Sequence, residues 1–164
     1  MEPERRFAEF RVEADGVIAG TAIRYGDTAK IGNFAERFEP GALRFSDVIA
    51  NLMHRREAPV ARTGAGLTLT DGPSSLEARI ELPDTVYGRE ARELVQARIL
   101  RGFSIEFRAE EQRWEGKTRI ITRASLTGLG VVDRPAYPDS VIAERMQAVY
   151  DGNAPRPYRP HLAF

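Results

Sequence analysis

Apolar and polar residues alternate along much of the first two-thirds of the chain, which is the pattern of half-buried strands. Two turn signals interrupt the alternation, one at Asp15-Gly16 and one at Asp71-Gly72-Pro73. Strands that follow one another at short spacing favour an antiparallel sheet or barrel over a doubly wound parallel sheet. The predicted strands cover residues 7–13, 17–25, 48–54, 67–70, 75–82, 102–112, 118–126 and 129–133.

Helical patterns are fewer. Residues 85–99 carry apolar side chains at helical spacing, with Asp84 or Thr85 as the N-cap. Residues 139–150 repeat this pattern, and residues 39–44 predict a single helical turn. We therefore expect a mainly β (α+β) fold, a compact antiparallel β-barrel of about seven strands with a few helices packed outside.

The domain organisation follows from the last residues. After residue 151 the chain becomes rich in proline, which predicts an extended C-terminal tail over residues 152–164. The rest of the chain, residues 1–151, has the size of one domain and is long enough to bury an apolar core.

Composition narrows the function without identifying it. The 164 residues include 24 Lys and Arg and 24 Asp and Glu, so the net charge is zero, which argues against binding nucleic acid through bulk charge. There is no cysteine, which excludes disulfides and thiolate chemistry, and no apolar run long enough to span a membrane. No histidine and carboxylate cluster has metal-ligand spacing. We expect no metal, no cofactor, no nucleic acid and no membrane partner.

His54 and Ser104 are the main candidates for chemistry. His54 ends a predicted strand, and alternation puts it on the apolar face of Val48 and Leu52, so it is either a core-edge histidine or a general base. Ser104 is either a solvent-facing strand residue or a nucleophile, and a serine nucleophile needs a base. The other histidine, His161, lies in the proline-rich tail, which leaves His54 as the credible base.

An ordered set of motifs resembles the prohead proteases of tailed bacteriophages, which are capsid-maturation serine proteases similar in fold to the herpesvirus assemblins. The resemblance covers roughly residues 7 to 150. Gene transfer agents and prophages carry proteins of the same type. The motifs are, in order, Phe38-Glu39-Pro40-Gly41-Ala42, the strand ending in His54, Leu82-Pro83-Asp84-Thr85, Tyr87-Gly88-Arg89, Arg101-Gly102-Phe103-Ser104-Ile105, Trp114 and Val131-Val132-Asp133-Arg134-Pro135-Ala136-Tyr137-Pro138.

The resemblance implies a β-barrel with a histidine–serine pair, histidine first, about fifty residues apart. His54 and Ser104 are 50 positions apart. Ser104 is therefore the expected nucleophile and His54 the expected general base. An arginine near the developing oxyanion is also implied: Arg134 lies in about the right place and Arg101 is a second option. The alternative for Arg134 is an ion pair with Asp133 at the end of a strand.

The third catalytic residue departs from the family pattern. Relatives often carry an acid where this chain has Gly128, and a glycine where it has Glu106. We predict that Glu106, on the strand face of the serine, orients His54. The alternative is a surface glutamate paired with Arg108 or with a neighbouring strand. Asp133 is a weaker candidate for the third residue, and a serine–histidine dyad is also open.

The implied function is that of a serine endopeptidase that cleaves a scaffold protein, or the scaffold segment of the major capsid protein, and itself. The implied partners are the major capsid protein or a scaffold protein, and a second copy of the chain as a homodimer. The implied location is inside the procapsid, in the cytoplasm of the bacterial host. Two other classes stay open: a catalytically silent capsid-assembly protein of the same fold, and a β-barrel binding module unrelated to phages.

Overall fold

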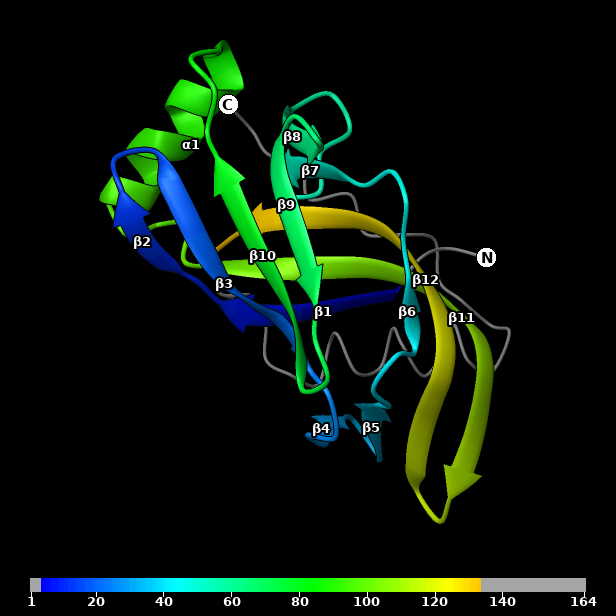
Figure 1. The fold of residues 1–164 in the computed structure, drawn as a ribbon. Coiled ribbons are helices and arrows are strands. Elements are labelled where there is room, and N and C mark those ends of the chain that lie inside the picture. Colours follow the sequence, from blue (N-terminus) through cyan, green and yellow to red (C-terminus); the bar gives the residue numbers. More distant parts are fainter. Residues whose placement is uncertain (1–3, 134–164) are drawn as a thin grey trace.

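One continuous sheet dominates the computed structural model, which describes residues 4–133 of the chain. In this part of the chain, twelve strands curl around an apolar core and a single helix packs at one end (Figure 1). The helix is α1 (Val86–Gln96). The strands are β1 (Glu4–Glu9), β2 (Arg11–Ala14), β3 (Val17–Arg24), β4 (Ala29–Ile31), β5 (Phe34–Phe38), β6 (Leu43–Arg44), β7 (Ile49–Leu52), β8 (Pro59–Thr63), β9 (Gly66–Asp71), β10 (Ser75–Glu81), β11 (Gly102–Glu115) and β12 (Thr118–Val132).

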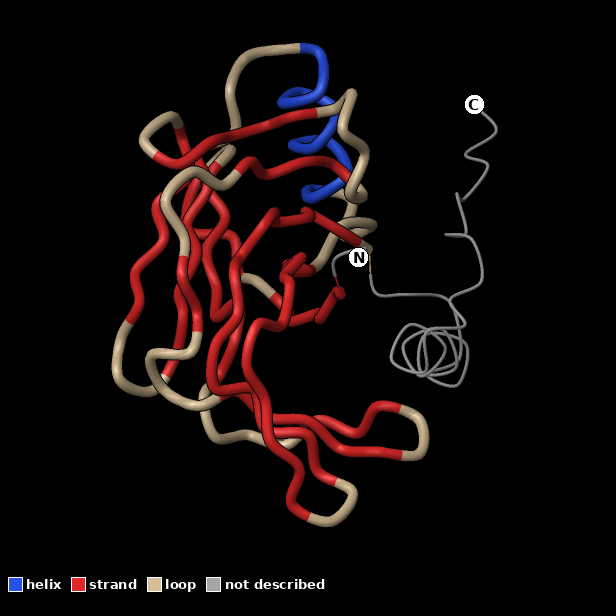
Figure 2. The backbone as a smooth tube through the Cα atoms, turned by 90° about the vertical axis from the view of Figure 1, so that its right-hand side faces the viewer, coloured by secondary structure: helices blue, strands red, loops and turns tan. Residues whose placement is uncertain are grey.

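The sheet curls because the two ends of its main path are neighbours in the chain. The path runs β1-β11-β12-β7-β8-β9-β10-β3-β2, and only Phe10 separates β1 from β2. β1 also contacts β3, but no ladder between these two strands occurs in the described residues. The shape is therefore a curled half-barrel (Figure 2). The mainly β class is confirmed, and the closed barrel of about seven strands is wrong.

Strand direction also corrects the sequence prediction. β12 pairs antiparallel with β11, but it pairs in parallel with β5, β6 and β7. β8 and β9 are parallel as well. β12 has 15 residues, so three short segments that run the same way share its edge one after another. The chain keeps its direction from β5 through β6 to β7 instead of turning back after each strand. The sheet is therefore mixed rather than antiparallel.

Several element boundaries differ from the predicted ones. The predicted break between residues 126 and 129 is absent, because β12 runs through it. Residues 39–44 form a turn followed by β6 rather than a helical turn. The short strands β4, β5, β6 and β8 were not predicted, since segments of two to five residues carry too little alternation to detect.

The helix prediction over residues 85–99 is confirmed by α1. Thr85 is its N-cap, and its side chain accepts a hydrogen bond from the backbone N–H of Gly88. The predicted helix over residues 139–150 and the predicted tail over residues 152–164 lie outside the described residues.

The core determines which side of β11 faces outward. Phe103, Ile105 and Phe107 are fully buried inside the curl. Phe103 packs against Phe10, and Phe107 packs edge-on against Phe38, with ring centroids 5.2 and 5.0 Å apart. Burying each large apolar side chain stabilises the fold by roughly 1.5–3 kcal/mol. Because strand side chains alternate, the residues between these three project from the other face of the sheet.

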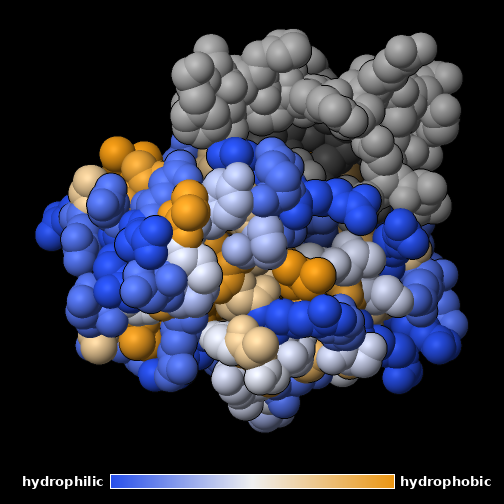
Figure 3. Space-filling model, turned by 90° about the horizontal axis from the view of Figure 1, so that it is seen from above, coloured by the Kyte–Doolittle hydropathy of each residue, from blue (hydrophilic) through white to orange (hydrophobic). Residues whose placement is uncertain are grey.

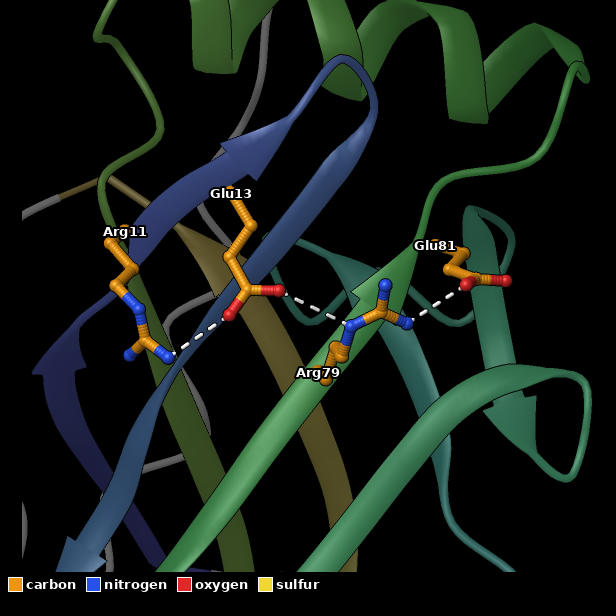
Figure 4. A network of polar contacts seen from close by, with 4 residues as sticks. All are labelled: Arg11, Glu13, Arg79 and Glu81. Atoms are coloured by element: carbon orange, nitrogen blue, oxygen red, sulfur yellow. Dashed lines mark hydrogen bonds and ion pairs between the residues drawn. The ribbon is translucent and has the colours of Figure 1, made fainter.

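The surface away from the core is mostly polar. Arg11, Glu13, Arg79 and Glu81 form a chain of ion pairs across β2 and β10, at 2.8 to 3.3 Å (Figure 4). Seen from above, hydrophilic side chains cover most of the described part of this face, with apolar patches among them (Figure 3). Exposed pairs of this kind contribute little to stability, because solvent and salt screen them.

Candidate active site

β11 brings Ser104 and Glu106 to the face of the sheet opposite the core. They alternate with Phe103, Ile105 and Phe107, which are buried in the core. The sequence prediction that Ser104 and Glu106 share a strand face is therefore confirmed. Ser104 is only 6% exposed, so it is not the solvent-facing residue of the alternative interpretation.

Two glycines of β12 lie directly across the ladder from these residues. Ser104 pairs with Gly130, and Glu106 pairs with Gly128. Paired residues of adjacent strands project to the same face, so this face of β12 has no side chain at either position. Glycine within a strand often marks the close approach of another group. Here the groups that approach come from β11 and from the turn after β7.

His54 fills the space above Gly130. A Cβ added to Gly130 would lie 2.6 Å from Cε1, 2.7 Å from Nε2 and 2.9 Å from Nδ1 of the imidazole. Real Cβ atoms essentially never come that close, so the ring occupies the volume that a side chain at position 130 would need. Because Gly130 is the register partner of Ser104, the imidazole stands next to the serine.

The backbone after β7 turns His54 onto this face. β7 ends at Leu52, and both Met53 and His54 adopt left-handed backbone conformations, with φ of 50° and 56°. The Met53 N–H bonds the carbonyl of Val131, which holds this turn against β12. The sequence prediction that His54 shares the apolar face of Val48 and Leu52 is wrong, because the alternation of the strand stops before the turn.

Glu106 contacts the imidazole on its Nδ1 side. Its Oε1 lies against Nδ1 of His54, and the two side chains are 18% and 8% exposed. Gly128 leaves room for this, since a Cβ there would lie 3.4 Å from Oε2 of Glu106. A carboxylate at Nδ1 favours the tautomer whose Nε2 can accept a proton, and low exposure strengthens the attraction. The geometry matches the predicted pairing of Glu106 with His54.

The other predicted site residues lie at the end of β11 and β12 or beyond it. Asp133 directly follows β12, and burial raises the pKa of its carboxyl, against weaker opposing effects of a backbone hydrogen bond and of the Arg101 charge. Arg101 is exposed, and its backbone N–H donates a hydrogen bond to the carbonyl of Val132. Arg134 lies outside the described residues.

Sequence reasoning missed the two glycines across the ladder and the position of Asn51 beside them. Gly128 was considered only as the position of a lost acid, and Gly130 was not considered. The signal was present: a Gly-x-Gly step inside a strand indicates close approach of other groups. Asn51 on β7 is the register partner of Gly130 and so projects to the same face. No pattern in the sequence marks it.

A sizeable cavity of the described residues lies elsewhere. It measures about 550 Å³ and opens at the seam between β1 and β3, with Phe10, Ile23 and Phe38 among its lining. Neither Ser104 nor His54 lines it. In residues 4–133 there is no cluster of three or more His, Asp and Glu that could hold a metal ion. Over the same residues, no helix is both long and apolar enough to cross a membrane.

A serine, a histidine and a carboxylate, gathered on one face of a sheet, form the side-chain set that serine hydrolases use. The comparisons with known proteins agree with this class. The family model of the caudovirus prohead serine protease matches residues 4–152, and the chain belongs to this family. This family is one of serine peptidases, so the alternative of a β-barrel binding module unrelated to phages is removed.

No curated protein and no solved structure matches the chain. The similarity to the assemblin fold that the sequence resemblance implied therefore stays a prediction.

Proposed function

We propose that this protein is a capsid-maturation endopeptidase in which Ser104 is the nucleophile, His54 the general base and Glu106 the residue that orients the imidazole. The observation that carries the proposal is the position of the imidazole. It lies above the glycine that faces Ser104, with a carboxylate against its Nδ1. Membership of the prohead serine protease family supports the same assignment.

The chemistry is an acyl transfer in two halves. Oγ of Ser104 attacks the scissile carbonyl carbon while Nε2 of His54 takes the hydroxyl proton. Collapse of the tetrahedral intermediate breaks the C–N bond, and the imidazolium gives its proton to the leaving amine. Water then attacks the acyl-enzyme with His54 as base and releases the acid product. Glu106 stabilises the imidazolium throughout without being protonated itself.

The oxyanion needs donors that are already in position before the reaction. Arg134 remains the proposed source, on the family resemblance, and the guanidinium of Arg101 is the second candidate. The proposed substrates are a scaffold protein or the scaffold segment of the major capsid protein, together with the protease chain itself. The proposed site of action is the interior of the procapsid in the bacterial host, and a homodimer is a further proposal.

The test is co-expression with the major capsid protein from the same genome, read by intact mass. Wild type is compared with Ser104→Ala, and Ser125→Ala serves as a matched control on β12 of the same hairpin. Fragments of capsid protein or protease are expected with wild type and Ser125→Ala and not with Ser104→Ala. If wild type forms a complex with capsid protein but cuts nothing, the silent assembly protein is the better description. Fragments that persist in Ser104→Ala would overturn the assignment of the nucleophile.

A further inference from the structure

Asn51 lies in one row with the two residues of the proposed acyl-transfer site. Asn51 on β7 pairs with Gly130 on β12, and Gly130 pairs with Ser104 on β11. Three residues in register across adjacent strands project to the same face. The middle position of the row has no side chain, and the imidazole of His54 occupies that place. Asn51 and Ser104 therefore flank the ring from opposite sides.

The carboxamide of Asn51 has an unusual feature. Its Oδ1 is buried from solvent and has no hydrogen-bond partner. Leaving a buried acceptor unsatisfied costs about 1–3 kcal/mol, so such groups are rare in folded proteins and need an explanation. An apolar side chain of the same size would remove this cost. An asparagine that lowers stability at this position points to a use in the chemistry of the neighbouring ring.

We propose that Asn51 is a positioning residue for the general base: its carboxamide oxygen faces the imidazole and stabilises the imidazolium formed when Ser104 gives up its proton. The proposal rests on the proposed function, because it needs His54 as the base. The negative end of an amide dipole beside a cationic ring is favourable, and the low exposure of the ring strengthens the effect. The attraction between this oxygen and the ring is strongest when the ring is charged, that is, during the reaction.

The charged neighbours of the imidazole determine the direction in which a substitution of Asn51 should shift the pKa of His54. Glu106 lies against Nδ1, and Arg55 directly follows His54 in the chain. Asn51 adds a partial negative charge to this set. Removing it should lower the pKa of His54, and placing a full carboxylate there should raise it.

The experiment compares Asn51→Leu and Asn51→Asp with wild type and with Asn33→Leu, a matched control in the exposed turn between β4 and β5. The full-length chain is used. Three properties are measured: the rate at which a fluorophosphonate labels the serine at each pH, the pKa of His54 from its imidazole NMR signals, and the thermal unfolding temperature.

Asn51→Leu is expected to label about three- to tenfold more slowly, with its pH midpoint and the pKa of His54 both lower by about half a unit. Asn51→Asp is expected to move both midpoints upward. The Leu variant should be no less stable than wild type, because an unsatisfied acceptor has gone. A residue with a purely structural role would instead lose stability and labelling together.

Two outcomes overturn the proposal. In one, Asn51→Leu behaves like Asn33→Leu in rate and in the pKa of His54. In the other, labelling slows while the pKa of His54 is unchanged, which would assign Asn51 to binding the attacked group instead. Wild type that is not labelled at Ser104 would overturn the proposed function. The NMR titration would still report in that case whether Asn51 acts on the ring.

Discussion

The hairpin of β11 and β12 contains two halves with the same strands but different surroundings. In the first half, residues 102–107 face residues 126–132 within the curled sheet. In the second half, residues 108–115 face residues 118–125 and extend beyond the curl (Figure 1). Both halves carry glutamate on β11: Glu106 in the first half, and Glu110, Glu111 and Glu115 in the second. They differ in what lies across the ladder from each glutamate.

In the outer half the carboxylates face an arginine. Glu111 pairs across the ladder with Arg123, whose guanidinium contacts Glu110 at 3.0 Å and Glu111 at 3.4 Å. In the inner half Glu106 faces Gly128, which offers no charge, and its carboxylate reaches His54. Glutamate therefore pairs with an arginine in the outer half and can orient the imidazole in the inner half. The residue across the ladder determines which of these two contacts the carboxylate makes.

The largest expected effect comes from Glu106→Gln. The carboxylate at Nδ1 is lost and the amide cannot replace its charge, so the rate of serine labelling or capsid cleavage should fall about 10³- to 10⁴-fold. Glu111→Gln, which faces Arg123, is the matched control and should keep the wild-type rate. A Glu106→Gln enzyme at full rate would show that a serine–histidine dyad suffices, and would remove Glu106 from the site.

The second effect comes from removing a buried ion pair of the outer half. Glu36 on β5 and Arg119 on β12 pair at 3.0 Å, and they are 2% and 4% exposed. Glu36→Ala leaves a buried guanidinium without this carboxylate, which should lower the free energy of unfolding by about 3–5 kcal/mol. Urea unfolding followed by circular dichroism measures it. A change below 1 kcal/mol would mean that solvent or another group compensates for the loss.

The third prediction concerns Gly130, whose lack of a side chain leaves the space that the imidazole of His54 occupies. Gly130→Ala places a methyl group within 2.6 Å of the imidazole, so the ring must move. A displacement of about 1 Å should slow the reaction about a hundredfold, equal to about 2.7 kcal/mol in the barrier. Gly72→Ala, where the nearest atom is at 3.5 Å, is the control and should have no effect. Unchanged labelling by Gly130→Ala would show that the ring's position is not required.

The comparison also shows what the sequence could predict. The alternation of Phe103, Ile105 and Phe107 correctly predicted that Ser104 and Glu106 share the opposite face, because alternation is a local property of one strand. The helix of residues 86–96 was equally local. The pairing of His54 with Ser104 was predicted from the family resemblance, since the pattern of one strand does not indicate which group lies across from it.

The predictions that were wrong concern features that depend on long-range geometry. The face of His54 depends on two left-handed residues after β7, and neither is glycine, so composition does not mark the turn. The open half-barrel depends on how three short strands share the edge of β12. Asn51 enters the site through the register of β7 with β12, which a single sequence does not encode in any readable pattern.

The smallest expected effect tests the exposed charges of the outer half. Arg113 contacts both Glu39 and Glu115, and its hydrogen bond lowers the pKa of Glu39, against a weaker opposing effect of burial. A lowered folded-state pKa means that this pair stabilises the fold above the ordinary glutamate pKa of 4.5 and that the contribution is lost as pH falls through the folded value. Arg113→Gln should therefore lower the unfolding temperature at pH 7 by about 2 °C or less, and by less still at pH 3 or in high salt. Serine labelling should be unchanged, because Arg113 lies in the half of the hairpin that faces no histidine. A slower labelling rate in this variant would show that the two halves are coupled, and the division between them would then be wrong.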